Sequence, residues 1–166
     1  LTVAWSSDGA IGSIEDLRGS VVVVDFWATW CTPCIMSFPK LREVRERYEG
    51  FDVVVLGVTS HQGVRVKPDG GGGVDCTDDP CKEEGLMPGF MEEMRMTWPV
   101  VFTEEPCTNA DFGVSGIPHV AIIDPAGVVR YTGLTPFMPL ERKALVVDAL
   151  LEEFGLPAPI SDDDAP

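Results

Sequence analysis

Residues 21–34 have the sequence VVVVDFWATWCTPC, an apolar run followed closely by two cysteines that are separated by two residues. Val21 to Phe26 is apolar except for Asp25, which is typical of a strand buried on both faces of a sheet. From Pro33 to Glu49 apolar residues recur at helical spacing among charged ones, and Gly50 ends this pattern. The cysteine pair is therefore expected where a buried strand gives way to an amphipathic helix.

The segments after this helix predict an α/β domain. Residues 51–58 form a second continuous apolar run, so that strand, helix and strand make a unit with parallel strands and a right-handed crossover. Pro-Ala-Gly at 125–127 separates two strand-like runs, which predicts a hairpin and an antiparallel end to the sheet. The remaining segments are predicted as a helix over 86–96, a strand over 98–102, hairpin strands over 120–124 and 128–132, and a helix over 140–154.

Length and charge restrict the classes of protein to which the chain can belong. Its 166 residues correspond to one domain at the usual size of about 150 residues, and a hydrophobic content of 45% excludes wholesale disorder. With 27 acidic and 12 basic residues the net charge is −15, so the chain is expected to repel nucleic acid. No apolar run approaches the length of about 18 residues that a membrane span requires.

The chain is expected to fold as one domain over residues 1–156, followed by an acidic, flexible tail at 157–166. Residues 60–85 have no periodicity and contain four consecutive glycines, which predicts a long loop inserted after the second core strand. Leu1 is not a methionine, so the chain is expected to have been processed, and any signal or membrane anchor would lie upstream of it.

Cys31 and Cys34 have the spacing of a thiol–disulfide exchange site. The first turn of a helix has free backbone N–H groups and the positive end of the helix dipole, which favour a thiolate. We expect a lowered pKa for Cys31, within about 3.5 to 7.5, and a shielded Cys34 that reacts second. With two residues between them, the sulfurs can close a disulfide. Half of a zinc site is the alternative, but no second pair with ligand spacing follows.

The segment that contains this pair, residues 23–34, resembles the active-site segment of the thioredoxin superfamily. Three other segments resemble its TlpA/ResA-like branch, namely Asp-Leu-Arg-Gly at 16–19, Trp-Pro-Val at 98–100 and Val-Ser-Gly-Ile-Pro at 114–118. The resemblance implies a thioredoxin-like α/β fold, in which a central mixed sheet is flanked by helices on both faces. It also implies a thiol–disulfide oxidoreductase that acts on protein disulfides and needs no cofactor beyond its own redox-active disulfide.

The resemblance also implies how a substrate would bind. The Ile117–Pro118 bond is expected to be cis and to face the sulfur of Cys31, so that the backbone of Ile117 pairs with an extended substrate segment. Trp30 is expected to form an apolar wall beside the cysteines. The predicted substrate-binding residues are Trp30, Thr32, Pro33, Ile117 and Pro118.

The TlpA/ResA-like branch acts outside the cytoplasm, so the resemblance implies a periplasmic or other extracytoplasmic monomer, with a membrane anchor only upstream of Leu1. Its partners would be protein thiols and disulfides and an upstream thiol donor, and it would act as a reductant.

A copper metallochaperone is a rival, but it would need three residues between its cysteines. A peroxidase of this fold would need the arrangement Pro-x-x-x-Thr-x-x-Cys, whose proline is absent before Cys31. A noncatalytic partner-binding domain would not be expected to retain both cysteines.

Asp25 is an acid within a buried strand, where an ionised side chain costs desolvation energy. The resemblance implies that this acid exchanges a proton with Cys34 through water, a role that a raised pKa would suit. The alternative is that the carboxyl group turns to solvent at the end of the strand. Asp25 is therefore predicted as a catalytic residue together with the two cysteines.

The three other cysteines lie outside the family pattern. Cys76 and Cys81 are separated by four residues, so an oxidising compartment would close them into a structural disulfide, and a redox relay with the active-site pair is the alternative. Cys107 is expected to be an unpaired thiol in a loop. A metal site is not predicted, because the separations between these cysteines and His61 fit no zinc pattern.

Overall fold

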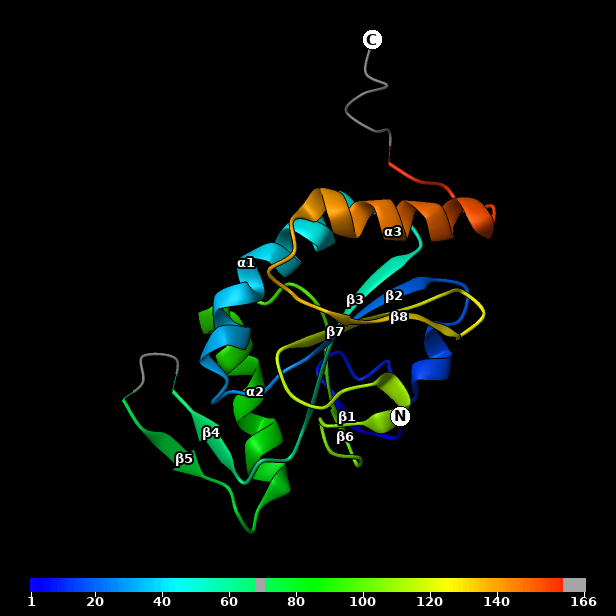
Figure 1. The fold of residues 1–166 in the computed structure, drawn as a ribbon. Coiled ribbons are helices and arrows are strands. Elements are labelled where there is room, and N and C mark those ends of the chain that lie inside the picture. The colour runs from blue at the N-terminus through cyan, green and yellow to red at the C-terminus, as the bar shows by residue number, and fades with distance from the viewer. Residues whose placement is uncertain (68–70, 160–166) are drawn as a thin grey trace.

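The computed structural model describes residues 1–67 and 71–159 (Figure 1). Its strands are β1 (Val3–Ser6), β2 (Val21–Phe26), β3 (Val53–Ser60), β4 (Val64–Val66), β5 (Gly73–Asp75), β6 (Val100–Thr103), β7 (His119–Ile123) and β8 (Val129–Leu134). Its helices are α1 (Thr32–Arg47), α2 (Pro80–Met94) and α3 (Leu140–Glu153), with 3₁₀ helices η1 (Ile14–Leu17) and η2 (Ala110–Phe112). The order β2, α1, β3 confirms the predicted unit around the cysteine pair.

Six strands form one mixed sheet in the order β1-β6-β3-β2-β7-β8. β2 lies parallel to β3, and β3 lies parallel to β6, whereas β1, β7 and β8 run antiparallel to their neighbours. β2 lies in the interior of the sheet and is buried along its whole length, as its valines predict. β7 and β8 confirm the predicted hairpin. β1, which the sequence patterns do not predict, is held by its pairing with β6.

The three α-helices pack into one apolar core on one face of the sheet. Trp27, directly after β2, links two of them, because its ring contacts Phe38 of α1 at a centroid distance of 5.3 Å and stacks on Phe90 of α2 at 5.5 Å. Val147 and Leu151 of α3 are buried in the same core. The opposite face is covered by η1, η2 and their flanking loops. Helices therefore flank both faces, but the α-helices share one of them.

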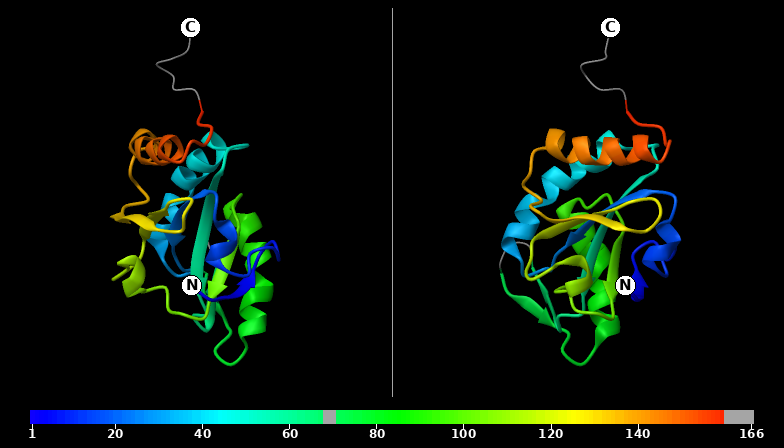
Figure 2. Two further views of the ribbon diagram at one scale, coloured as in Figure 1. Left: turned by 90° about the vertical axis from the view of Figure 1, so that its right-hand side faces the viewer. Right: turned by 45° about the vertical axis from the view of Figure 1, so that its right-hand side comes forward.

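α3 lies across the C-terminal part of α1 at one end of the molecule, as Figures 1 and 2 show. The hydroxyl of Tyr48 donates to the carboxylate of Asp148 at 2.6 Å. The guanidinium group of Arg47 approaches the same carboxylate at 3.3 Å. These contacts fix α3 against the helix that carries the cysteines.

The prediction of a long loop over residues 60–85 is wrong. β4 and β5 pair as an antiparallel hairpin within this segment, and α2 already begins at Pro80. Asp79 caps α2, since its side chain accepts a hydrogen bond from the backbone N–H of Lys82 at 3.0 Å. A capping aspartate followed by proline is a helix-start signal. The four consecutive glycines at 70–73 favour a loop, so the prediction missed this helix start.

Most of the predicted acidic tail, residues 160–166, lies outside the described part of the chain. Residues 157–159 have no regular secondary structure. Within the ranges 1–67 and 71–159, no helix combines the length and the apolar character that crossing a membrane requires. In the described part of the chain, regular structure thus ends with α3.

Candidate active site

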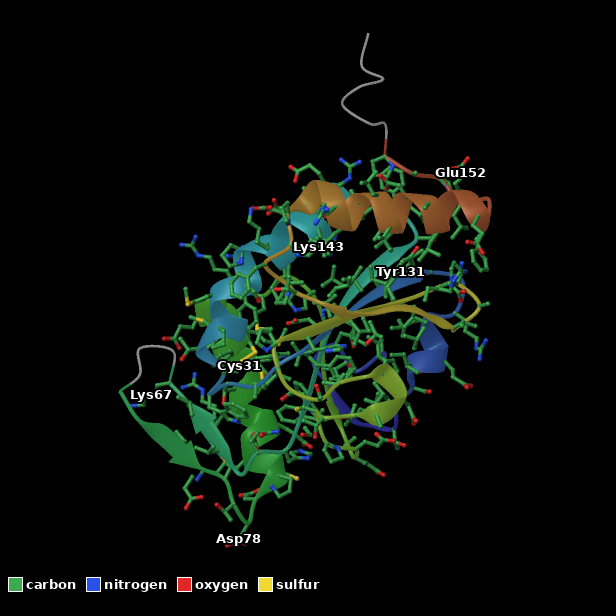
Figure 3. All side chains as sticks on the ribbon, viewed as in Figure 1. Cys31, Lys67, Asp78, Tyr131, Lys143 and Glu152 are labelled. Carbon is green, nitrogen blue, oxygen red and sulfur yellow. A yellow bond between two sulfur atoms is a disulfide. The ribbon has the colours of Figure 1, made fainter. Side chains whose placement is uncertain are left out.

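Cys31 and Cys34 form a disulfide at the start of α1 (Figure 3), with their Cα atoms 5.2 Å apart. Cys31 is the N-cap residue, and its sulfur accepts a hydrogen bond from the backbone N–H of Cys34 at 3.3 Å. Free N–H groups and the positive end of the helix dipole stabilise a thiolate at such a position. Cys31 retains 3% exposure and Cys34 none. An incoming sulfur would therefore reach Cys31 first.

The Ile117–Pro118 peptide bond is cis and immediately precedes β7. β2 and β7 pair antiparallel with Phe26 opposite His119, so the residues after β2 and those before β7 meet at one edge of the sheet. A cavity of about 260 Å³ at this edge is lined by both Trp30 and Ile117. The sheet therefore brings the predicted substrate-binding segment beside the cysteine loop.

The predicted contact residues next to the disulfide form an exposed surface. Trp30 is 50% exposed, and Thr32 and Pro33 are exposed in the first turn of α1. The indole N–H of Trp30 donates to the side-chain carbonyl of Gln62 at 3.0 Å, which orients the ring. Met36 is also exposed and adds an apolar side chain further along α1. Exposed apolar side chains around a reactive bond suit the docking of another protein.

Cys107 is a free thiol in a loop, as predicted, and it is buried beside this surface. Its sulfur lies 3.2 Å from the hydroxyl oxygen of Ser60 and 3.6 Å from the carbonyl oxygen of Trp27. Cys107, Ser60 and Gln62 line the same cavity as Trp30. These residues come from segments far apart in the chain, so no local spacing pointed to them.

Asp25 is fully buried, and neither of its carboxylate oxygens has a hydrogen-bond partner among the described residues. Burial raises the pKa of Asp25 to about 7, and the charge of Lys143 opposes this rise. The alternative of a carboxyl group turned to solvent is therefore wrong. Asp25 alternates with Val23 on the face that α1 covers, which places it beneath the helix that carries Cys34. An acid with a pKa near 7 can accept and release a proton at physiological pH.

Lys143 of α3 is a buried residue that was not predicted to belong to the site. It is 1% exposed, and its ammonium group donates to the carbonyl oxygen of Pro136 at 2.6 Å. Burial lowers the pKa of Lys143 to about 8, and the charge of Asp25 opposes this decrease. A signal was present, because Lys143 occupies the same helical stripe as Val147 and Leu151, where an apolar residue is normal.

The predicted disulfide between Cys76 and Cys81 is not present, and both residues are free thiols. Cys76 follows β5 and is buried, with its sulfur 3.5 Å from the carbonyl oxygen of Val74. Cys81 is exposed in the first turn of α2. The hairpin and the helix thus hold the two side chains in different environments. In the part of the chain that the structure describes, no group of three or more His, Cys, Asp or Glu residues is placed to hold a metal ion.

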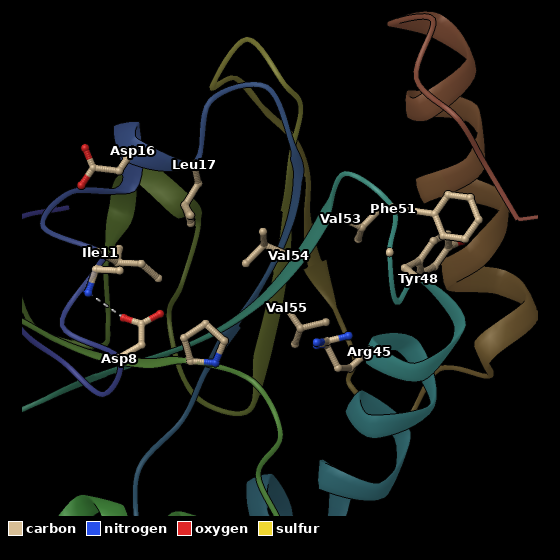
Figure 4. Close-up of a pocket in the computed structure, with 13 residues that line it drawn as sticks. Asp8, Ile11, Asp16, Leu17, Arg45, Tyr48, Phe51, Val53, Val54 and Val55 are labelled. Carbon is tan, nitrogen blue, oxygen red and sulfur yellow. Dashed lines mark hydrogen bonds between the residues drawn. The ribbon is translucent and has the colours of Figure 1, made fainter.

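A second cavity, of about 430 Å³, lies near the opposite end of β3 (Figure 4). Val53 to Val55, Ile11 and Tyr48 supply apolar parts of its lining, and Asp8 and Arg45 supply charged ones. None of the predicted catalytic or substrate-binding residues lines it. This cavity is therefore separate from the site around the disulfide.

Residues 2–132 match the family model described as the AhpC/TSA family. The chain is 27% identical over 123 residues to the thioredoxin-like protein YneN of Bacillus subtilis, covering 74% of this chain and 61% of that protein. It is 25% identical over 123 residues to the thiol-disulfide oxidoreductase ResA of Geobacillus thermodenitrificans, covering 74% of this chain and 59% of that protein. The chain thus spans about three fifths of the length of these relatives.

Solved structures share the fold. The exposed lipoprotein thioredoxin of Streptococcus pneumoniae is 25% identical, with a TM-score of 0.63 over 86% of this chain and 94% of that one. A thiol-disulfide isomerase of Corynebacterium glutamicum is 22% identical, with a TM-score of 0.65 over 91% of this chain and 93% of that one. The mixed sheet and these similarities confirm the predicted thioredoxin-like fold. The chain belongs to the AhpC/TSA family of thioredoxin-like proteins.

Proposed function

We propose that the protein is a thiol–disulfide oxidoreductase that exchanges disulfides with protein substrates. The observation that carries the proposal is the Cys31–Cys34 disulfide at the N-terminus of α1, in which Cys31 retains 3% exposure and Cys34 is fully buried. The relative ResA is named a thiol-disulfide oxidoreductase, which supports the same activity here. No metal or organic cofactor is needed for this reaction, because the two cysteines carry the electrons.

In the reduced protein, Cys31 would act as the nucleophile. Its thiolate attacks one sulfur of a substrate disulfide, a bond forms between these sulfurs, and the other substrate sulfur leaves as a thiolate that takes a proton from solvent. The backbone of Ile117 would hold an extended substrate segment as an added strand. The proposed contact residues are Trp30, Thr32, Pro33, Ile117 and Pro118.

Cys34 would then resolve the mixed disulfide. The carboxylate of Asp25 accepts the proton of the Cys34 thiol through water, and the resulting thiolate attacks the sulfur of Cys31. The bond to the substrate breaks, and the second substrate sulfur leaves as a thiolate. The protein ends as the disulfide seen in the structure. Two electrons have passed to the substrate, so an upstream thiol donor must reduce the protein again.

We further propose that the protein works as a monomeric reductant outside the cytoplasm. The solved structure from Streptococcus pneumoniae is named an exposed lipoprotein thioredoxin, which supports this location. The net charge of −15 favours solubility and disfavours nucleic acid as a partner. Protein thiols and disulfides would be the substrates.

The test of the activity is the reduction of a protein disulfide by the purified chain, with dithiothreitol as the thiol donor. Catalysed reduction supports the proposal, and a rate equal to that of dithiothreitol alone contradicts it. Rapid consumption of hydroperoxide would favour a peroxidase instead, and tight stoichiometric binding of Cu(I) would favour a metallochaperone.

The direction of electron flow is tested separately, by equilibrating the Cys31–Cys34 pair in glutathione buffers. A reduction potential near that of thioredoxin, about −270 mV, would support a reductant. A potential near that of a strong oxidant such as DsbA, about −120 mV, would overturn the proposed direction while leaving the exchange activity intact.

Replacing Asp25 with asparagine (D25N) is expected to slow the resolving step at and above pH 7. The variant has no carboxylate to take the proton of Cys34, and general base catalysis contributes about 10²-fold or more. In the wild type the rate should rise as the pH passes through about 7, the pKa of Asp25, and D25N should lose this rise. Stopped-flow kinetics across the neutral pH range measures both. Asp52→Asn, at an exposed position before β3, is the control, and an unchanged D25N profile would remove Asp25 from the mechanism.

The same variant should change stability in a way that depends on pH. Folding raises the pKa of Asp25 from 3.8 to about 7, so the folded state binds a proton more tightly than the unfolded state. The wild type therefore loses stability as the pH rises between these values, by up to about 4 kcal/mol. D25N does not lose stability in this way, but it is destabilised by a different effect, because Lys143 has no counter-charge in this variant. Urea unfolding should show an advantage of D25N that grows with pH, and a constant difference would contradict the burial of the acid.

A further inference from the structure

We propose that Lys143 is a positioning residue for disulfide exchange, whose buried ammonium group supplies the counter-charge that lets Asp25 ionise beneath α1. The inference rests on the proposed oxidoreductase function and concerns the control of proton transfer from Cys34. Figure 3 shows Lys143 near the start of α3, beside α1. Lys143 would act through Asp25 and not by contact with a substrate.

The first observation is that Lys143 is buried to an extent unusual for a lysine. Glu141 and Arg142, the two residues before it on α3, are exposed, whereas Lys143 is 1% exposed. An ammonium group has three N–H donors. That of Lys143 donates a hydrogen bond to the carbonyl oxygen of Pro136 at 2.6 Å. Lysines normally extend to solvent, and an apolar residue at this position would avoid the desolvation cost. The buried charge therefore requires a compensating charge.

Asp25 is the group that meets this requirement. Both of its oxygens lack a hydrogen-bond partner among the described residues, and the charge that acts on it is that of Lys143. Gly57 of β3 and Val120 of β7 lie beside Asp25 in the sheet, so neither neighbouring strand offers a polar side chain at this position. His119 belongs to the opposite face, where its ring contacts Phe26 of the second core. Lys143 and Asp25 are thus each other's principal charged neighbour.

α1 also presents two charged groups to Lys143, and neither replaces Asp25. The charge of Glu43 raises the pKa of Lys143 and that of Lys40 lowers it, both less than Asp25 affects it. Glu43 and Lys40 pair with each other at 2.8 Å, and their side chains are 39% and 44% exposed. Solvent screens the effect of such exposed groups. Asp25 is fully buried, where electrostatic interactions are stronger.

The pair has a consequence for the chemistry of Cys34. The positive charge of Lys143 opposes the effect of burial on Asp25. Without that charge the pKa of Asp25 would rise further, and the acid would keep its proton at pH 7. A protonated Asp25 could not accept the proton of Cys34. The placement of α3 against α1 therefore sets the pH range in which the mixed disulfide is resolved.

A purely structural role is the alternative, in which Lys143 serves only to anchor the segment before α3 through its bond to Pro136. Loss of such an anchor would lower stability, and it would leave the pH dependence of the exchange reaction unchanged. The pH profile of the resolving step therefore separates the two roles, whereas a loss of activity at a single pH does not.

The test compares Lys143→Met, which removes the charge, with the wild type by stopped-flow kinetics. The pH at which the resolving rate reaches half its maximum should move upward by about one unit or more, so that the rate at pH 7 falls about fivefold or more. Arg142→Met removes an exposed charge from the adjacent position and should leave the profile unchanged. In a D25N background Lys143→Met should have no further effect on the profile. A folded Lys143→Met protein with the wild-type profile would overturn the proposal.

A measurement on the wild type keeps the proposal testable even where Lys143→Met does not fold. NMR titration of the Asp25 carboxyl carbon and the Lys143 side chain should show that each group responds to the ionisation of the other. In D25N, which lacks the counter-charge, the pKa of Lys143 should fall below its wild-type value, and an unchanged titration of Lys143 in D25N would overturn the proposal. Failure of the oxidoreductase function is a distinct result, because the wild type would then not reduce protein disulfides at any pH.

Discussion

Replacing Cys31 with serine (C31S) is expected to reduce the rate of protein disulfide reduction to that of the thiol donor alone. A serine hydroxyl is not ionised near neutral pH, so the variant has no nucleophile with which to begin the exchange. We expect a loss of at least about 10³-fold, within the range seen when other enzymes lose their nucleophile. The measurement is the dithiothreitol-coupled reduction of a protein disulfide at equal concentrations of wild type and variant.

The matched control for C31S is Cys81→Ser, because Cys81 is a free and exposed cysteine on a different helix. This control should turn over at the wild-type rate. The Cys31–Cys34 bond links residues only three apart in the sequence, so its loss should cost less stability than that of a long-range crosslink. Circular dichroism should therefore show a folded C31S protein. Full turnover by C31S would reject Cys31 as the nucleophile.

Replacing Cys34 with serine (C34S) is expected to stop the reaction at the mixed disulfide. Cys31 remains at the N-terminus of α1 and attacks the substrate, but no second thiol lies behind it to break the new bond. The variant should accumulate as a covalent complex with one substrate molecule, at a stoichiometry close to one, and turnover should fall to background. Non-reducing electrophoresis and intact-mass spectrometry measure the complex.

The trapped complex of C34S should disappear when a small thiol is added, because the bond is a disulfide. C31S should form no such complex, since Cys34 is fully buried and Cys31 is the sulfur with residual exposure. Equal trapping by C31S and C34S would show that the two sulfurs have equal access and would contradict the assigned order. Multiple turnovers by C34S would reject Cys34 as the resolving residue.

The local part of the site could be predicted from the sequence. Asp25, Cys31 and Cys34 lie within one strand and the first turn of one helix, and apolar periodicity and helix-start signals act over such short ranges. The position of Ile117 and Pro118 required the family resemblance, because their placement near the cysteine loop depends on the pairing of β2 with β7. The cis bond before β7 is observed in the structure and has no signal in the spacing of residues.

The segment after β3 could not be predicted in the same way. Its glycines favour a loop, although the segment contains a hairpin. The two strands of this hairpin have three residues each, which is too few to show the alternation of side chains that is typical of a strand. The expected disulfide of Cys76 and Cys81 depended on a flexible loop between them, and the start of α2 at Pro80 removes that condition. A short spacing between cysteines does not by itself place their sulfurs together, since the backbone between them decides the geometry.

The amino-acid order alone was enough to place a reactive cysteine pair between a buried strand and a helix, because both elements are specified by the periodicity of neighbouring residues. It also showed an acid in that strand, but it could not show what the acid contacts. Only the packing of α3 against α1 brings the charge of Lys143 to Asp25. Electrostatic compensation inside a protein acts through space, so the helical stripe that contains Lys143 indicates its burial but does not identify Asp25 as its partner.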